Sequence, residues 1–233
     1  MNLKIRNEAP ELMDDLTVSG PVVEQTLNEL DVVNRWLGGF RVTRSGLRRL
    51  IRKKAEKEIS LLDVGCGSGE QLVQMDRWLR KRKFIPTMAG MDANPFIAEI
   101  ARTHTAGIPE CRILVRDILD PKLRDMDPDI VVVTLFLHHF SQDRLVQLLS
   151  RLHSFAGLGL IINDLHRHPI AYHAIRLLTR WFSGSEMVKY DAPLSVARGF
   201  TRQELIDALD KAGIKNYRIR WKWAFRWQVI VEK

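Results

Sequence analysis

Three glycines at alternate positions, Gly65, Gly67 and Gly69, follow a short apolar run that contains Asp63. Glycine lets the backbone turn sharply and lets a ligand approach closely, because no Cβ stands in the way. Apolar residues at helical spacing come next, from Leu72 onward, so the stretch predicts a strand, a tight loop and a helix. This unit is typical of nucleotide-binding α/β proteins, and the rest of the chain must decide what it binds.

Two further acidic side chains end the next two predicted strands. Asp92 closes the strand at residues 87–92 and comes 27 residues after the first of the three glycines. A carboxylate there can accept both hydrogen bonds of a ribose diol, and such charge-assisted bonds are stronger than neutral ones. Asp117 closes the strand at residues 111–117, with Ile118 beside it. This pair can bind an exocyclic amine and flank a flat ring.

Five of the seven histidines follow two later predicted strands, so they can reach the same edge of the sheet. A hydroxyl group with a high pKa benefits from a general base, and histidine suits that role near neutral pH. We take His139 and His166 as the candidate catalytic residues. Each of the five can also serve packing alone. The five are His138, His139, His166, His168 and His173.

The elements that must position these residues alternate between strand and helix. Residues 129–137 form the most β-like run, apolar on both faces as a central parallel strand is. Residues 158–163 read as a further buried strand, and helices are expected to start at Asn94-Pro95 and at Ser141. This alternation predicts a mostly parallel sheet wound on both faces. Ligands bind such sheets beyond the carboxyl ends of the strands.

Helical patterns precede the glycines and return after the fifth strand. The first apolar period ends at Gly38-Gly39, and a basic helix is expected at residues 45–57. That helix can be a solvated face or a site for a polyanion. Residues 170–182 read as a helix, followed by a loop that holds Gly184, Pro193 and Gly199.

The last part of the chain carries a helix start and a β pattern. Thr201 and Glu204 have the spacing of a capping box for a helix that ends near Gly213. Every odd position of residues 217–231 is apolar or aromatic, which is half-buried β structure. A two-residue hairpin loop pairs positions of opposite parity. We therefore expect a three- or five-residue loop near Ala224, or an uninterrupted strand.

Composition limits the class of protein. The chain has 233 residues, 45% of them hydrophobic and 27% charged, as in a soluble globular domain. Its net charge of +8 raises the question of nucleic acid or an anionic membrane as partner. Cys66 and Cys111 suggest reduced thiols rather than a disulfide or metal site. Residues 1–15 lack a signal-peptide core, and residues 130–140 are too short to span a bilayer, so we expect a cytoplasmic protein.

Four stretches together resemble the class I S-adenosylmethionine-dependent methyltransferases. They are residues 63–69 (DVGCGSG), 90–94 (GMDAN), 116–118 (RDI) and 134–139 (TLFLHH). The resemblance covers residues 58–165 best. It implies a Rossmann-like, doubly wound α/β fold with a seven-stranded sheet, mostly parallel with the last strand antiparallel. A helical N-terminal cap and a helical insertion before the last helix complete the expected fold.

The same resemblance implies S-adenosylmethionine as cofactor and S-adenosylhomocysteine as product. In this family the glycine loop packs on the methionine portion, the second-strand acid binds the ribose and the third-strand acid binds the adenine. Carried over, the expected cofactor-binding residues are Asp63, Gly65, Cys66, Gly67, Gly69, Asp92, Ala93, Asp117, Ile118, Thr134 and Leu135. A nicotinamide site is the competing interpretation, but its loop has the spacing G-x-G-x-x-G. No metal site is expected.

We expect one methyltransferase domain over residues 1–233. It divides into an N-terminal cap (1–57), a cofactor-binding core (58–165), an acceptor-site insertion (166–200) and a terminal helix with strands (201–233). The acceptor pocket should lie between residues 12–41 and 166–200, whose apolar surplus favours a small, largely apolar or aromatic acceptor. Residues 10–15 and 34–39 resemble bacterial methyltransferases that modify polyketide-type or quinone-type products.

Methylation of a hydroxyl oxygen is the favoured reaction. The alternatives are C-methylation of a quinone-like ring, RNA methylation, and a methyltransferase-like protein that binds cofactor without catalysis. Nucleic acid is disfavoured, because residues 134–139 lack the Asn/Asp-Pro-Pro-aromatic signature of enzymes that methylate exocyclic amines. An anionic membrane surface is a further candidate partner. The oligomeric state stays open.

Overall fold

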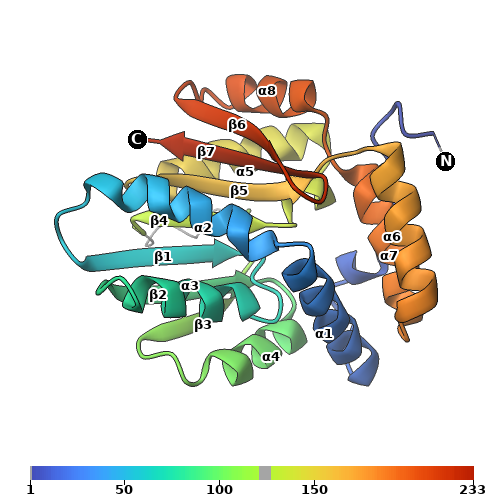
Figure 1. The fold of residues 1–233 in the computed structure, drawn as a ribbon, viewed down its shortest axis with the longest axis horizontal. Coiled ribbons are helices and arrows are strands. Elements are labelled where there is room, and N and C mark those ends of the chain that lie inside the picture. Colours follow the sequence, from blue (N-terminus) through green and yellow to red (C-terminus); the bar gives the residue numbers. More distant parts are fainter. Residues whose placement is uncertain (1, 121–126) are drawn as a thin grey trace.

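The computed structural model describes residues 2–120 and 127–233. Its centre is a seven-stranded sheet in the order β3-β2-β1-β4-β5-β7-β6 (Figure 1). The strand β7 pairs antiparallel with both β5 and β6, and the other pairs are parallel. The expected fold, including the antiparallel last strand, is confirmed. The strands are β1 (Glu58–Val64), β2 (Ile85–Asp92), β3 (Cys111–Val115), β4 (Ile130–Thr134), β5 (Gly159–Leu165), β6 (Tyr217–Lys222) and β7 (Arg226–Glu232).

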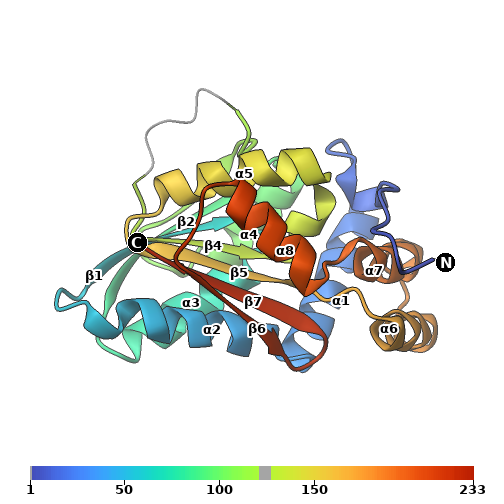
Figure 2. The same ribbon diagram turned by 90° about the horizontal axis from the view of Figure 1, so that it is seen from above.

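Helices cover both faces of the sheet (Figure 2). On one face α2 (Gly39–Leu50), α3 (Glu70–Arg80) and α4 (Pro95–Thr105) pack against β-strand residues such as Leu61, Val132 and Ile161. On the other face α5 (Gln142–Phe155) and α8 (Arg202–Lys211) pack against the strand residues that alternate with these, such as Leu62 and Val133. This alternation between two cores explains why the central strands are apolar at every position.

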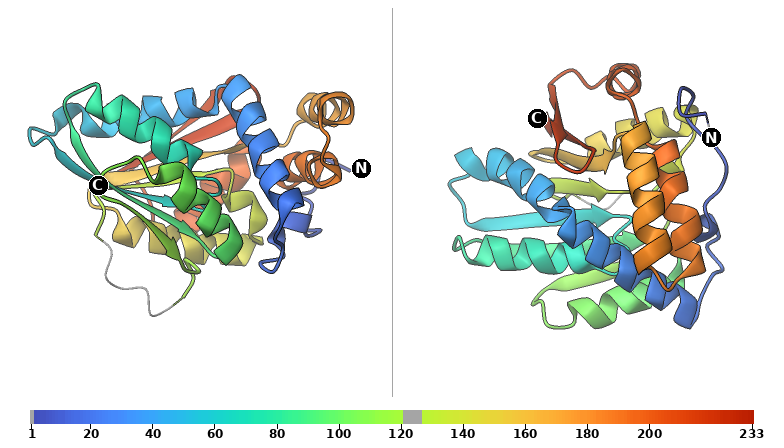
Figure 3. Two further views of the ribbon diagram at one scale, coloured as in Figure 1. Left: turned by 90° about the horizontal axis from the view of Figure 1, so that it is seen from below. Right: turned by 45° about the vertical axis from the view of Figure 1, so that its right-hand side comes forward.

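The remaining helices gather at one end of the sheet, beyond the carboxyl ends of its parallel strands (Figures 1 and 3). They are the 3-10 turn η1 (Leu12–Asp14), α1 (Pro21–Trp36), α6 (Pro169–Phe182) and α7 (Glu186–Arg198). Two further 3-10 turns are η2 (Ile51–Lys53) and η3 (Leu137–His139). Among the described helices, none combines the length and the apolar character needed to cross a bilayer.

Several local predictions are confirmed. The Asn94 side chain accepts hydrogen bonds from the backbone of Phe96 and Ile97, and α4 starts at Pro95, directly after Asn94. Thr201 and Glu204 form both halves of the capping box of α8. Lys222 pairs with Arg226, so a three-residue loop joins β6 to β7, and odd positions face odd positions across the hairpin.

Two predictions about helices are wrong. Residues 186–198 form the helix α7 rather than a loop, with Pro193 in its interior. The helix is buried on most of its surface among η1, α1 and α6, so no apolar period marks it, and this packing offsets the cost of the proline. The helix expected at residues 45–57 begins instead at Gly39 and ends at Leu50, because Val42, Thr43 and Leu47 also pack inward.

Candidate active site

A cavity of about 1070 Å³ lies between the carboxyl ends of the strands and the helices of the N-terminal cap and insertion. Most of the predicted site residues line it, brought together from the ends of four strands and the loops that follow them. Those in the lining are Asp63, Gly65, Cys66, Gly67, Asp92, Ala93, Asp117, Ile118, Thr134, Leu135 and His139. Gly69 and His166 are not among the lining residues.

The glycine loop is held tightly at the floor of this cavity. Gly65 has a φ of +68°, and a Cβ there would lie 2.3 Å from the ring of Phe136, so no other residue fits this position. The backbone N–H groups of Gly65 and Cys66 both donate to the carbonyl of Met91, at 2.8 and 3.0 Å. These bonds fix the loop against the end of β2.

Gly69 stands at the end of the glycine loop, where α3 begins. It caps α3 with a φ of +80°, and a Cβ there would lie 2.9 Å from the side chain of Thr105 on α4. The position therefore needs glycine for the close approach of two helices. Gly69 is not in contact with the cavity.

Two carboxylates lie beside the loop. Asp92 accepts hydrogen bonds from the backbone of Gly67, at 3.2 Å, and of Asn94, at 3.0 Å. Burial raises the pKa of Asp92, while these bonds lower it in part. Asp63 is fully buried, and burial beside Asp92 raises its pKa well above the ordinary value. Its Oδ1 atom has no hydrogen-bond partner among the described residues.

Asp117 and Ile118 follow β3 and differ in their exposure to solvent. Asp117 is exposed, and its Oδ1 accepts from the backbone of Leu119 at 2.8 Å, which closes a tight turn. Ile118 is buried against the core. Both line the cavity, one as an acceptor and the other as an apolar surface.

Asp31 of α1 is a lining residue that the sequence did not single out. The hydroxyl of Ser68 donates to its Oδ2 at 2.6 Å, which ties the N-terminal cap to the glycine loop. Burial raises the pKa of Asp31 to about 6. An acid in an amphipathic helix gives no sequence signal for this contact, since the two residues are 37 positions apart.

His139 belongs to a chain of charged groups in the cavity wall. Its Nδ1 atom lies 2.5 Å from Asp14 Oδ1, and Asp14 Oδ2 accepts from Arg198 Nη1 at 2.6 Å. Burial raises the pKa of Asp14, but the bonds from His139 and Arg198 outweigh it and hold that pKa below its ordinary range. Because Asp14 accepts at Nδ1, the Nε2 atom of His139 is the one left to meet a substrate.

His138 is placed differently from its neighbour. It is buried, with Nδ1 2.7 Å from Asp164 Oδ1 and Nε2 3.6 Å from Glu11 Oε1. Burial raises the pKa of Glu11 to about 7. Arg198 donates to the carbonyls of both His138 and His139, so it fixes the turn η3 that carries them. The three side chains of Glu11, His138 and His139 have ligand atoms within 4.8 Å of one another.

The structure does not bring His166 to the cavity. Its backbone N–H donates to the carbonyl of Phe225 at 2.8 Å, which draws the residue toward the β6–β7 turn. There the Trp221 indole donates to His166 Nδ1 at 3.2 Å, and the ring meets Trp227 edge-on at 4.8 Å. Burial lowers the pKa of His166.

Comparison with known proteins supports a methyl-transfer activity. Residues 61–156 match the family model described as "Methyltransferase domain". The sheet order and the glycine loop agree with this match. The chain is an S-adenosylmethionine-dependent methyltransferase with the fold of the class I enzymes. A search of curated protein sequences found no match.

Solved structures share the fold of this methyltransferase at low identity. A SAM-dependent methyltransferase from Aquifex aeolicus is 18% identical with a TM-score of 0.62, covering 88% of this chain and 95% of that one. Magnesium protoporphyrin IX methyltransferase from Synechocystis PCC 6803 is 12% identical with a TM-score of 0.56 over 95% and 89%. An O-methyltransferase family 2 protein from Planctomyces limnophilus, in complex with apigenin, is 18% identical with a TM-score of 0.53 over 75% and 51%.

The cavity of the methyltransferase fits its cofactor on two observations. The orphaned Oδ1 of Asp63 is a buried acceptor that needs a donor, and an ammonium group supplies one. The carboxylate of Asp92 uses one hydrogen bond on each oxygen, which leaves a lone pair on each for a diol.

Proposed function

We propose that this methyltransferase transfers a methyl group to the hydroxyl oxygen of a small, largely apolar or aromatic acceptor, with His139 as general base. The observation that carries this proposal is the bond from His139 to Asp14 in the wall of the cofactor cavity. The predicted second base, His166, has no such support, since it lies outside the cavity lining.

The cofactor is proposed to lie along the ends of β1 to β4. Asp92 would bind the ribose, and Asp117 with Ile118 would bind the adenine. The glycine loop would pack on the methionine portion, with Asp63 and Asp31 as the acids nearest to it. The positions of these groups in one lining, and the spare acceptor capacity of Asp63 and Asp92, support this arrangement.

When bound, the cofactor supplies a methyl group already activated on a sulfonium, so the protein has mainly to align the acceptor. His139 would take the hydroxyl proton at Nε2 as the oxygen attacks. Asp14 holds the imidazole in the tautomer that this requires and stabilises its charged form, and Arg198 holds Asp14. Such an arrangement raises a rate by roughly 10² to 10⁴.

The acceptor side of the cavity is largely apolar. The insertion contributes Ala171, Ile175 and Leu178 from α6, and the N-terminal segment contributes Met13 and Leu16. Such a surface favours an aromatic or aliphatic molecule over a sugar or an amino acid, because the burial of apolar surface is the main favourable contribution to the free energy of binding.

Turnover of a panel of phenols, hydroquinones and quinones with S-adenosylmethionine tests the proposal, with the methylated atom assigned by mass spectrometry and NMR. We expect oxygen methylation, and we expect His139→Ala to lower kcat while the Kd for S-adenosylhomocysteine stays the same. Methylation at ring carbon, or full turnover by His139→Ala, would contradict it.

A further inference from the structure

Three elements contribute residues to one part of the cavity lining. They are the C-terminal end of α1, the side of α6 and the turn between β6 and β7, represented by Leu37, Leu178 and Trp223. Leu178 and Trp223 are 36 and 74% exposed, so the cavity reaches the surface beside them. These elements come from distant parts of the chain and lie around one side of the molecule (Figures 1 and 3).

The same three elements carry large aromatic side chains that stand in solvent. Trp36, Trp181, Phe182 and Trp223 are between 74 and 83% exposed, and Trp221 is 50% exposed. We call these five residues the aromatic rim. A cluster of exposed aromatic side chains marks an interaction site on a folded protein, and tryptophan favours the interface between water and lipid.

Different sides of the helix α6 carry different types of residue. Exposed Ile170, Leu177 and Trp181 form a central stripe at positions i, i+7 and i+11. On one side of the stripe Leu178 is part of the cavity lining. On the other side lie the exposed side chains of Arg176 and Arg180. A helix with aromatic and aliphatic residues on its outer face and arginines at its flank is the type that lies in a membrane surface.

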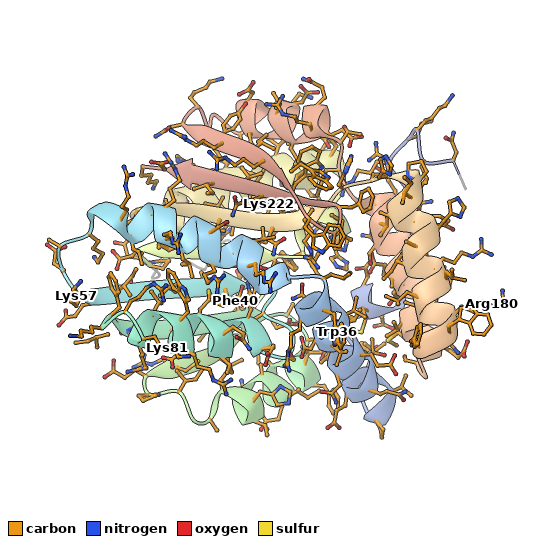
Figure 4. All side chains as sticks on the ribbon, in the orientation of Figure 1. Trp36, Phe40, Lys57, Lys81, Arg180 and Lys222 are labelled. Carbon is orange, nitrogen blue, oxygen red and sulfur yellow. The ribbon has the colours of Figure 1, made fainter. Side chains whose placement is uncertain are left out.

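The charge of α6 and of the β6–β7 turn matches an anionic surface. The helix α6 and residues 220–226 contain five basic side chains and no Asp or Glu. One of them, Arg226, is buried. The others are Arg176, Arg180, Arg220 and Lys222. Figure 4 shows Arg180 at this end of the molecule and Lys57 and Lys81 at the opposite end. Basic residues next to an apolar stripe are attracted to anionic lipid headgroups.

We propose that the aromatic rim and α6 dock on an anionic lipid bilayer, with the opening of the cavity against the membrane. The acceptor is then a membrane-dissolved molecule with a polar hydroxyl-bearing end, an extension that rests on the proposed function. Such a molecule enters the cavity between α1, α6 and the β6–β7 turn without crossing water, while the cofactor site stays at the far side of the lining.

Sedimentation with vesicles tests the docking without cofactor or acceptor. Vesicles of phosphatidylcholine alone are compared with equal parts of phosphatidylcholine and phosphatidylglycerol, each at low and high salt. We expect binding to the anionic vesicles that weakens with salt. The double variants Trp181→Ala/Phe182→Ala and Arg176→Glu/Arg180→Glu each lower the partition constant by at least about tenfold.

The matched controls are Ile85→Ala, an exposed apolar residue on β2, and Lys57→Glu/Lys81→Glu at the opposite end. We expect both to bind as the parent does. Failure to bind anionic vesicles, or equal losses in the controls, overturns the proposal. So does a dimer in analytical ultracentrifugation that Trp181→Ala/Phe182→Ala dissolves, since the rim would then join two copies.

The two proposals fail separately. Methylation of soluble phenols without vesicles reports on the reaction alone, and vesicle binding reports on the docking alone. Vesicle-bound protein that methylates only soluble acceptors would contradict the membrane-dissolved acceptor and leave the reaction standing.

Discussion

The imidazole of His139 lies 2.5 Å, from Nδ1 to Oδ1, from the carboxylate of Asp14, a residue 125 positions earlier in the chain. Asp14 belongs to the N-terminal segment, and His139 follows β4. The contact therefore joins the cap to the edge of the sheet at which the cofactor is proposed to bind. It also sets the tautomer of a histidine in the cavity wall.

We expect Asp14→Asn to lower kcat by about 10²-fold, because an amide can hold the imidazole in the wrong tautomer and cannot stabilise its charge. Steady-state kinetics with the best acceptor, together with the Kd for S-adenosylhomocysteine, measures this. Asp15→Asn, at the exposed neighbour, is the control and should keep parental kinetics. A parental kcat in Asp14→Asn would show that the contact serves packing only.

The sequence predicted those parts of the molecule that depend on short-range patterns. The individual strands, the cap of α4 and the parity of the β6–β7 hairpin follow from residues a few positions apart. The seven-stranded sheet with its antiparallel last strand was expected from the resemblance to the methyltransferases. Helix α7 was missed, because burial on several sides removes the apolar period by which a helix is recognised. His166 was placed at the cavity by its position after β5, but a backbone bond to Phe225 turns it toward the hairpin.

The chain of charged groups in the cavity wall could not be predicted from the sequence, for a different reason. Asp14, His139 and Arg198 stand in three separate segments, and no spacing relates them. The same holds for Asp31 and Ser68, which meet only because α1 packs across the glycine loop. Such contacts become visible once the segments are placed in space.

We expect Gly65→Ala to abolish cofactor binding and to destabilise the fold by at least about 1–2 kcal/mol. The new Cβ would lie 2.3 Å from Phe136, on a backbone with a φ of +68°. Calorimetric titration and the Tm measure both effects. Gly107→Ala is the control, because nothing lies within 4 Å of a Cβ there. Tight cofactor binding by Gly65→Ala would exclude the loop as the cofactor site.

The buried carboxyl of Glu11 predicts a pH-dependent loss of stability. Its pKa is raised from 4.5 to about 7 in the folded protein, so the unfolded chain releases this proton first as pH rises. The group therefore costs stability between these two values, up to about 3 kcal/mol above pH 7. Glu11→Gln should be more stable than the parent near pH 8 and similar near pH 4, measured by urea unfolding. The exposed Glu8→Gln should match the parent at both, and an equal gain there would contradict the assignment.

Asp31 should make cofactor affinity depend on pH. Its pKa is raised to about 6, and its contact with Ser68 places it beside the glycine loop. Below that pH the carboxyl is neutral, and above it the charge can attract the ammonium group of the methionine portion. The affinity for S-adenosylhomocysteine should therefore rise as pH increases through about 6, and Asp31→Asn should remove this rise and weaken binding about tenfold near pH 8. Glu24→Gln, on the exposed side of the same helix, is the control and should keep the parental profile. A parental profile in Asp31→Asn would assign the titration to another group, and Asp63 is then the next to substitute.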